Sequence, residues 1–478
     1  MTVSTDHPRI RRRQSKGKLW PWFLVGALVL LVVGFVVAKL AIDSYLKSDR
    51  FREFVGHKTG ETVHAHVEVM PFQFTGSTIY CDGLKSQGTA ASAFSALDLD
   101  QIRIEISARR FFEHVWQVDH VEVQRARLDL GGPRLPEETQ PTPAKDAQAE
   151  GGHSSPWLPN RVEIGAAAIH SVDLAWKDGG VRDTALDVTQ KEGGWYMVAS
   201  GGSVRQATLP TLNLESAHVL YRAPSLFIQS ATLREFGGGT IDATGEAQIG
   251  DHVDLLVRIN RIPVDPLLES DWRAKLTGNL NGEIHIKSRL PIEDGPTLNG
   301  AVSLSDGRLE ALPVLDNIAN LTHTERYRRL SLTNTSGDFE RDARHLSVKN
   351  FVMESKGLIR IEGAFTVQND MIDGDFQVGV TPSTLDTIIG SKEKVFTVAR
   401  AGYLWAPMHL SGPVSKPKED LSPRLEAAAM GVIFDTAKGA VQGILDKAKD
   451  PNVQKNATDA AQQLQKAADQ GLKMIFGN

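Results

Sequence analysis

The segment LTGNLNGEIHIKSRL, residues 276–290, decides the fold class of this chain. Apolar side chains and one glycine occupy alternate positions, and charged or polar side chains lie between them. The first set is Leu280, Gly282, Ile284, Ile286 and Leu290, and the second is Glu283, His285, Lys287 and Arg289. A period of two residues is that of a β-strand with one apolar and one polar face. The segment therefore predicts one strand of a half-buried antiparallel sheet.

The same alternation recurs along the chain. In residues 359–380 the apolar positions are Ile359, Ile361, Phe365, Val367, Phe376, Val378 and Val380. From residue 161 to 410, short strand patterns follow one another, separated by turn signals such as Asp306-Gly307. Helical spacing is nearly absent there, so parallel α/β architecture with crossover helices is excluded. Roughly twenty strands side by side at ~4.8 Å predict a sheet at most about 95 Å long.

The sequence before residue 161 has three further features. Residues 97–106 alternate like a strand, with a phase change at Gln101 that predicts a β-bulge. Residues 131–160 are rich in proline and polar residues, so they predict a disordered linker. A short helix is expected over residues 45–59, and another interrupts the later strands at 313–321.

Residues 19–42, LWPWFLVGALVLLVVGFVVAKLAI, contain one charge, and this apolar length crosses a hydrocarbon core of ~30 Å. They predict a single transmembrane helix. The basic residues that precede it place the N-terminus in the cytoplasm and the rest of the chain outside it. A cleaved signal peptide is the alternative, but its apolar core would be shorter. The anchor residues are Trp20, Trp22, Leu24, Leu30 and Phe35.

Near the C-terminus the pattern changes to helical spacing. Apolar residues from Leu425 to Leu445 recur at three- and four-residue intervals after Ser422-Pro423, which predicts an amphipathic helix over residues 423–448. Pro451 ends it, and a second, more polar helix is expected to follow. The first helix either closes the far end of the sheet or docks an envelope protein, with membrane contact as the lesser option. A helix that merely covers a sheet edge is the plainest alternative.

Composition and motifs argue against several classes of function. The formal net charge is −5, and no strongly basic region lies beyond the first twenty residues, so nucleic acid is not an expected partner. Sequence signatures of nucleotide binding, zinc proteases and serine hydrolases are absent. We therefore expect that the protein is not an enzyme and binds no cofactor or metal. His64 with His66, and Asp338 with Glu340 and Asp342, are interpreted as exposed polar residues. The single cysteine, Cys81, is interpreted as a packed residue.

The order of these features resembles the AsmA family, membrane-anchored envelope proteins of double-membraned bacteria related in architecture to TamB and to chorein-type bridge lipid-transfer proteins. Residues 51–130 resemble its N-terminal module, with Gly83-Leu84 and the strand at Leu97. Residues 298–417 resemble its C-terminal region, with LNGAVSLSDGRL and then GLIRIEG at 357–363. The resemblance implies a long twisted antiparallel sheet that curls into an open apolar groove for phospholipid acyl chains. The residues between these two regions share only the general strand pattern of the family.

We therefore expect a mainly β protein that is anchored in the inner membrane, binds phospholipids in the periplasm, and assists lipid transport or envelope maintenance. The alternative is a non-catalytic envelope scaffold in which two sheets pack as a sandwich. The groove lining is expected to be Leu280, Ile284, Ile286, Ile359, Ile361, Phe365, Val367, Phe376, Val378 and Val380. The expected divisions are a basic tail (1–18), the membrane helix (19–42), an N-terminal β module (43–130), the linker (131–160), a middle β region (161–297), a C-terminal β region (298–420) and a helical tail (421–478).

The charge asymmetry around residues 19–42 makes a first prediction. Alkaline phosphatase fused after Asp49 should be active, because this reporter folds only outside the cytoplasm, and a cytoplasmic reporter at the same position should be silent. Enzyme assays on the two fusions in cells provide the measurement. The opposite pattern of activities would contradict the predicted topology.

Overall fold

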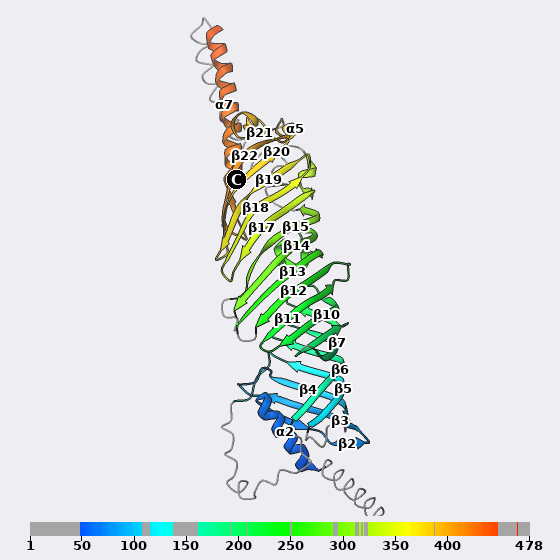
Figure 1. The fold of residues 1–478 in the computed structure, drawn as a ribbon. Helices are drawn as coiled ribbons and strands as arrows, with labels where there is room; N and C mark the ends of the chain where they lie inside the picture. Colours follow the sequence, from blue (N-terminus) through cyan, green and yellow to red (C-terminus); the bar gives the residue numbers. More distant parts are fainter. Residues whose placement is uncertain are drawn as a thin grey trace, which may run out of the picture.

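A computed structural model describes residues 48–107, 115–136, 161–191, 193–207, 209–248, 251–289, 295–310, 315–316, 319, 324–386, 388–447 and 466. Within these residues the protein is mainly β, and 23 strands join in one sheet. Figure 1 shows an elongated, twisted sheet with α2 (Asp49–Val63) at one end and α7 (Leu421–Lys447) at the other. The expected anchor at 19–42, with its five named residues, lies outside the described ranges. Inside those ranges, no helix has the length and apolarity needed to cross a membrane.

The part of the sheet nearer α2 contains ten strands. They are β1 (Ala65–Val69), β2 (Phe72–Thr75), β3 (Thr78–Gly88), β4 (Ala96–Ser107), β5 (Val115–Asp129), β6 (Arg161–Trp176), β7 (Gly179–Lys191), β8 (Gly194–Ser200), β9 (Ser203–Gln206) and β10 (Leu212–Arg222).

The part nearer α7 contains the other strands and several short helices. The strands are β11 (Ser225–Arg234), β12 (Thr240–Gln248), β13 (His252–Pro263), β14 (Leu276–Arg289), β15 (Thr297–Glu310), β16 (Arg329–Leu332), β17 (Asn334–Arg341), β18 (His345–Ser355), β19 (Ile359–Gln368), β20 (Met371–Val380), β21 (Val398–Arg400), β22 (Tyr403–Pro413) and β23 (Lys418–Glu419). The helices are η3 (Asp265–Leu267), α3 (Ser270–Arg273), η4 (Glu325–Tyr327), α5 (Pro382–Leu385) and α6 (Ser391–Lys394).

Strands that follow one another in the sequence are neighbours in the sheet. Four rows are each made of two strands that pair end to end along the same neighbour: β1 with β2 on β3, β8 with β9 on β7, β16 with β17 on β15, and β21 with β23 on β22. The 23 strands therefore form nineteen rows. At ~4.8 Å between rows the sheet is about 86 Å long, near the length that the sequence predicts.

One strand pair corrects the expectation of a purely antiparallel sheet. β5 and β6 are parallel, with Val115 opposite Arg161 and Asp129 opposite Ala175. Parallel neighbours need a connection of a dozen residues or more, and residues 130–160 supply it. The first part of the expected linker is ordered, because the backbone N–H of Leu135 donates to the carbonyl of Gly88 at 2.9 Å. Strand pairing also continues across the expected divisions at 131–160 and, between β14 and β15, near 297.

The two long edges of the sheet differ from β10 onwards. At one edge, here called the turn edge, short turns such as 223–224, 342–344 and 369–370 join the strands. At the other, here called the helix edge, η3 and α3 follow β13, residues 311–328 follow β15, and α5 and α6 follow β20. The short helices therefore lie along the helix edge only. They can cover the apolar face near that edge, but not near the turn edge.

Two of the helical predictions, at 45–59 and 423–448, are confirmed with shifted bounds. The helix expected at 45–59 is α2, which begins at Asp49 and ends at Val63. The helix expected at 423–448 is α7, and Lys466 in the region of the second expected helix is also helical. Of residues 313–321, only 315, 316 and 319 are described, and all three are helical. The remainder of these segments lies outside the described residues.

The β-bulge predicted at Gln101 is not found at that residue, because the strand register does not shift there. Gln101 has a φ of 53°. Its neighbours Asp100 and Ile102 pair with residues that are two apart on β3 and also two apart on β5, so the register of both pairs is kept across Gln101. The shift in register between β4 and β5 lies instead at Glu105 and Ile106.

Two glycines let α2 approach the first strand closely. A Cβ at Gly60 would lie 2.5 Å from the carbonyl oxygen of Ala65, and a Cβ at Gly56 would lie 2.8 Å from that of Val67. Neither side chain could exist there without movement of the backbone. By contrast, a Cβ at Gly439 in α7 would meet nothing within 4 Å.

These two environments make a second prediction. Gly60→Ala should lower the free energy of unfolding by about 1–3 kcal/mol, because α2 must move away from β1. Gly439→Ala should leave it unchanged or raise it by up to about 1 kcal/mol, because alanine is the better helix former. Unfolding curves of the detergent-purified proteins provide the measurement. A Gly60→Ala protein at least as stable as the Gly439→Ala protein would contradict the close packing.

Candidate functional site

An unbroken line of apolar residues and glycines crosses one face of the sheet. Each member is the cross-strand partner of the next, so the line runs perpendicular to the strands through eighteen rows. We call it the central lane: Phe72, Cys81, Ile102, Val123, Ile169, Leu186, Ala199, Ala217, Ala231, Ala243, Val257, Ile284, Gly300, Phe339, Val348, Phe365, Gly374 and Leu410.

A second line runs beside it on the same face, nearer the turn edge. It also crosses eighteen rows, and a single member carries a charge. We call it the rim lane: Phe74, Ile79, Ile104, Val121, Ala167, Val188, Met197, Val219, Ile228, Gly245, Leu255, Ile286, Leu298, Arg341, Leu346, Val367, Ile372 and Gly412.

Burial on this face is uneven. Apart from buried Ile79 and exposed Arg341, every member of the rim lane is half-buried. Toward the helix edge, Leu212, Ile241 and Ile262 are buried, and Leu267 of η3 packs against them. A larger closed core forms near α7, where Leu385, Leu421 and Leu425 from the helices pack on β19 and β20. The apolar face is therefore covered along the helix edge and at the α7 end, and Cys81, Ile102 and Val123 of the central lane are buried in a third cluster in β3, β4 and β5. Between these parts the face is half-exposed.

The structure divides the predicted lining residues into two groups. Ile284 and Phe365 belong to the central lane, Ile286 and Val367 belong to the rim lane, and Leu280 lies on the same strand as Ile284. These five are half-buried. The remaining five belong to the covered end: Ile359, Val378 and Val380 are buried in the closed core, Ile361 packs against it, and Phe376 is 6% exposed. The short helices that cover them are too brief to be recognised by periodicity.

Three phenylalanines mark the boundary between the two groups. The rings of Phe365 and Phe376 stack with centroids 6.1 Å apart, and Phe351 meets both edge-on. Glycines lie opposite two of them, because a Cβ at Gly363 would be 2.7 Å from the Phe376 ring and one at Gly374 would be 2.5 Å from Phe365 Cβ. The aromatic cluster therefore fills the face just before the closed core begins.

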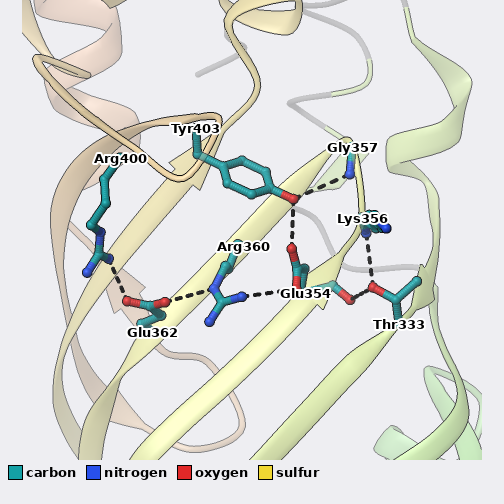
Figure 2. Close-up of polar contacts among 8 residues, drawn as sticks. All are labelled: Thr333, Glu354, Lys356, Gly357, Arg360, Glu362, Arg400 and Tyr403. Atoms are coloured by element: carbon teal, nitrogen blue, oxygen red, sulfur yellow. Dashed lines mark hydrogen bonds and ion pairs between the residues drawn. The ribbon is translucent and has the colours of Figure 1, made fainter.

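The opposite face is polar. Behind this boundary it carries a network of charged hydrogen bonds, which we call the brace. Figure 2 shows how Glu354, Arg360, Glu362, Arg400 and Tyr403 connect β18, β19, β21 and β22. Glu362 accepts hydrogen bonds from Arg360 at 2.7 Å and from Arg400 at 2.5 Å, and Arg360 also bonds to Glu354 at 3.1 Å. The Tyr403 hydroxyl donates to Glu354 at 2.9 Å. Charged hydrogen bonds thus hold the strands under the aromatic cluster in a fixed register.

The brace changes the acidity of its members. Partial burial would raise the pKa of Glu362, but the hydrogen bonds from Arg360 and Arg400 lower it below the ordinary value of a glutamate. Burial, together with the hydrogen bond to Glu354, raises the pKa of Tyr403. Arg400 also lies over the Trp405 ring, 4.2 Å from its centroid.

The other candidate residues have structural surroundings. Cys81 is a buried member of the central lane, as expected of a packed residue, and burial raises the pKa of its thiol. His64 is exposed with a φ of 55°, in the turn before β1, so it does not share a strand with His66. Asp338 accepts a hydrogen bond from Asn350 at 2.7 Å on the polar face.

A pocket of about 520 Å³ opens between β4, β5, β6 and β7 on the polar side of the sheet. Four aspartates and three arginines are among its lining residues, and one of the latter, Arg127, lies 3.6 Å from Asp100. These seven charges sum to −1, so charges of the two signs largely compensate one another there. The pocket therefore offers no strong attraction to a ligand of one charge, and the apolar face is the stronger candidate.

Neither a protein-family model, nor a curated protein, nor a solved structure matches this chain. The functional interpretation therefore depends on the two lanes themselves. Sequence alternation identified strands and faces, but it could not order the rows, so it missed both lanes and the charge at Arg341.

The brace makes a third prediction. Glu362→Gln should lower the free energy of unfolding by about 1–2 kcal/mol, since Glu362 is partly buried and accepts two charged hydrogen bonds. Glu283→Gln is the matched control, because the Arg258–Glu283 pair at 2.9 Å is 63% and 48% exposed. Its cost should be below about 0.5 kcal/mol.

Acid should remove this difference. A carboxyl with a lowered pKa stabilises the fold above its unfolded pKa of about 4, and the contribution is lost as the pH falls through the folded value. Unfolding curves at pH 7 and below pH 4 provide the measurement. Equal costs for the two variants, or a Glu362→Gln cost that persists in acid, would contradict the role of the brace.

Proposed function

We propose that this protein binds phospholipids with their acyl chains along the central and rim lanes and assists their movement or the maintenance of the cell envelope, without catalysis. Residues 19–42 would anchor it in the inner membrane with the sheet in the periplasm, as in the AsmA family that its sequence resembles. The observation that carries the proposal is the continuity of two apolar lanes across eighteen rows.

The physical argument is that half-exposed apolar surface of this extent favours a ligand or partner. All 23 described strands belong to one sheet, so the sandwich expected of a scaffold, with a second sheet over the apolar face, is not found among them. Acyl chains suit the surface, because they are apolar, flexible and long enough to lie across several rows. A lane lined by many weak contacts holds such chains without a single specific pocket.

The C-terminal region supports a second role for the helical tail. Leu421, Leu425 and Ala428 of α7 lie in the closed core, so the start of the helix covers the end of the sheet. Met430 and Phe434, further along α7, are 43% and 50% exposed. Figure 1 shows α7 continuing beyond the last strands. We propose that this projecting part contacts an envelope protein, while lipid binding belongs to the sheet.

A charge on the rim lane tests the lipid proposal. Ile286→Asp should abolish copurification of phospholipid, because a carboxylate facing acyl chains is costly. Thr297→Asp is the control, since Thr297 is exposed on the polar face one row away, opposite Lys287. Native mass spectrometry of the detergent-extracted full chain provides the measurement, with a melting curve for each variant. Equal lipid loads in both variants, or no lipid in the unsubstituted protein, would favour the scaffold function instead.

A further inference from the structure

The single charge in the rim lane, Arg341, is placed where an amphiphile would meet water. It is the last residue of β17, at the turn edge, and its cross-strand partners are Leu298 and Leu346. It shares the apolar face with Phe339, two residues earlier, whereas Glu340 points to the polar face. Its side chain is exposed. A guanidinium therefore stands at the border of an otherwise apolar lane.

Arg341 has no ion-pair partner among the described residues. The carboxylate that follows it, Asp342, is engaged elsewhere, because its Oδ1 accepts the backbone N–H groups of Arg344 and His345, both at 2.8 Å. These hydrogen bonds lower the pKa of Asp342. Arg344, in the same turn, adds a second positive charge, which also helps to lower the pKa of Asp342. Other arginines on this sheet, such as Arg258 and Arg360, are paired with glutamates on the polar face.

On the basis of the lipid-binding function proposed above, we propose that Arg341 binds the phosphate of a phospholipid whose acyl chains lie along the two lanes. The guanidinium has a planar set of donors that matches two phosphate oxygens. Its neighbours Leu298, Phe339 and Leu346 supply the apolar surface on which the attached chains would rest. An amphiphile without phosphate would gain the apolar contacts alone.

Arg341 on the apolar face distinguishes a lipid phosphate from a free phosphate ester. A small phosphate ester could contact Arg341 only at an exposed position. A single ion pair that is surrounded by water is weak. A phospholipid adds the burial of its chains, so both interactions act together. Arg341 therefore selects among lipids for those with a phosphate.

The experiment compares two lipid probes, phosphatidylglycerol and diacylglycerol. The two probes have identical acyl chains, and in each probe one chain carries a fluorophore at its end. The full chain is used in detergent, and affinities are measured by fluorescence. We expect the unsubstituted protein to bind phosphatidylglycerol about tenfold more tightly than diacylglycerol, the effect of one charged hydrogen-bonded contact. Arg341→Gln should bring the two affinities together, and Arg341→Lys should leave an intermediate preference.

Arg289→Gln is the matched control. Arg289 is the last residue of β14, two rows from Arg341 at the same edge, but it lies on the polar face and is likewise exposed. This variant should keep the full preference for phosphatidylglycerol. Melting curves should show that both glutamine variants are folded, since each replaces an exposed side chain.

Three results would overturn the inference. If Arg341→Gln retains the tenfold preference, Arg341 does not bind the phosphate, although the lanes still bind lipid. If glycerol 3-phosphate alone displaces phosphatidylglycerol at equal concentration, the site is an anion site and not a lipid site. If the unsubstituted protein takes up neither probe, the lipid-binding function fails together with this inference.

Discussion

The backbone pairing between successive strands is the constraint on which the rest of this structure depends. Because side chains alternate between faces, a slip of one residue at any row would turn the apolar residues of that strand to the polar side. Seventeen consecutive pairings across eighteen rows avoid this, from Phe72 opposite Cys81 to Gly374 opposite Leu410. The continuity of the lanes is therefore a property of register, and no single residue produces it.

The sequence predicted the strands well because each carries its own period. Ile284 and Ile286 could be assigned to one face without knowledge of any neighbour. It could not predict the direction of pairing, since alternation is the same in parallel and antiparallel strands, and the β5–β6 pair was missed for that reason. Arg341 was missed because it stands beside Glu340 and Asp342, where polar residues indicate a turn.

The same limit applies to burial. Ile359, Val378 and Val380 have the pattern of open-face residues, yet Leu385 of α5 and Leu421 and Leu425 of α7 pack with them in the closed core. α5 and α6 contain four residues each, which is too short for a helical period to be visible. Local pattern thus identifies a face of the sheet, whereas tertiary packing decides which part of it remains accessible.

The parallel β5–β6 pair has a consequence for how the chain reaches this structure. Most neighbouring rows are joined by short connections, so their contacts are local in sequence and form early. β5 and β6 are separated by residues 130–160, and joining them requires closure of a longer loop. The rows before and after this junction can each assemble by local pairing as they emerge. Their union across β5 and β6 is then expected to be the slower step in folding of the sheet.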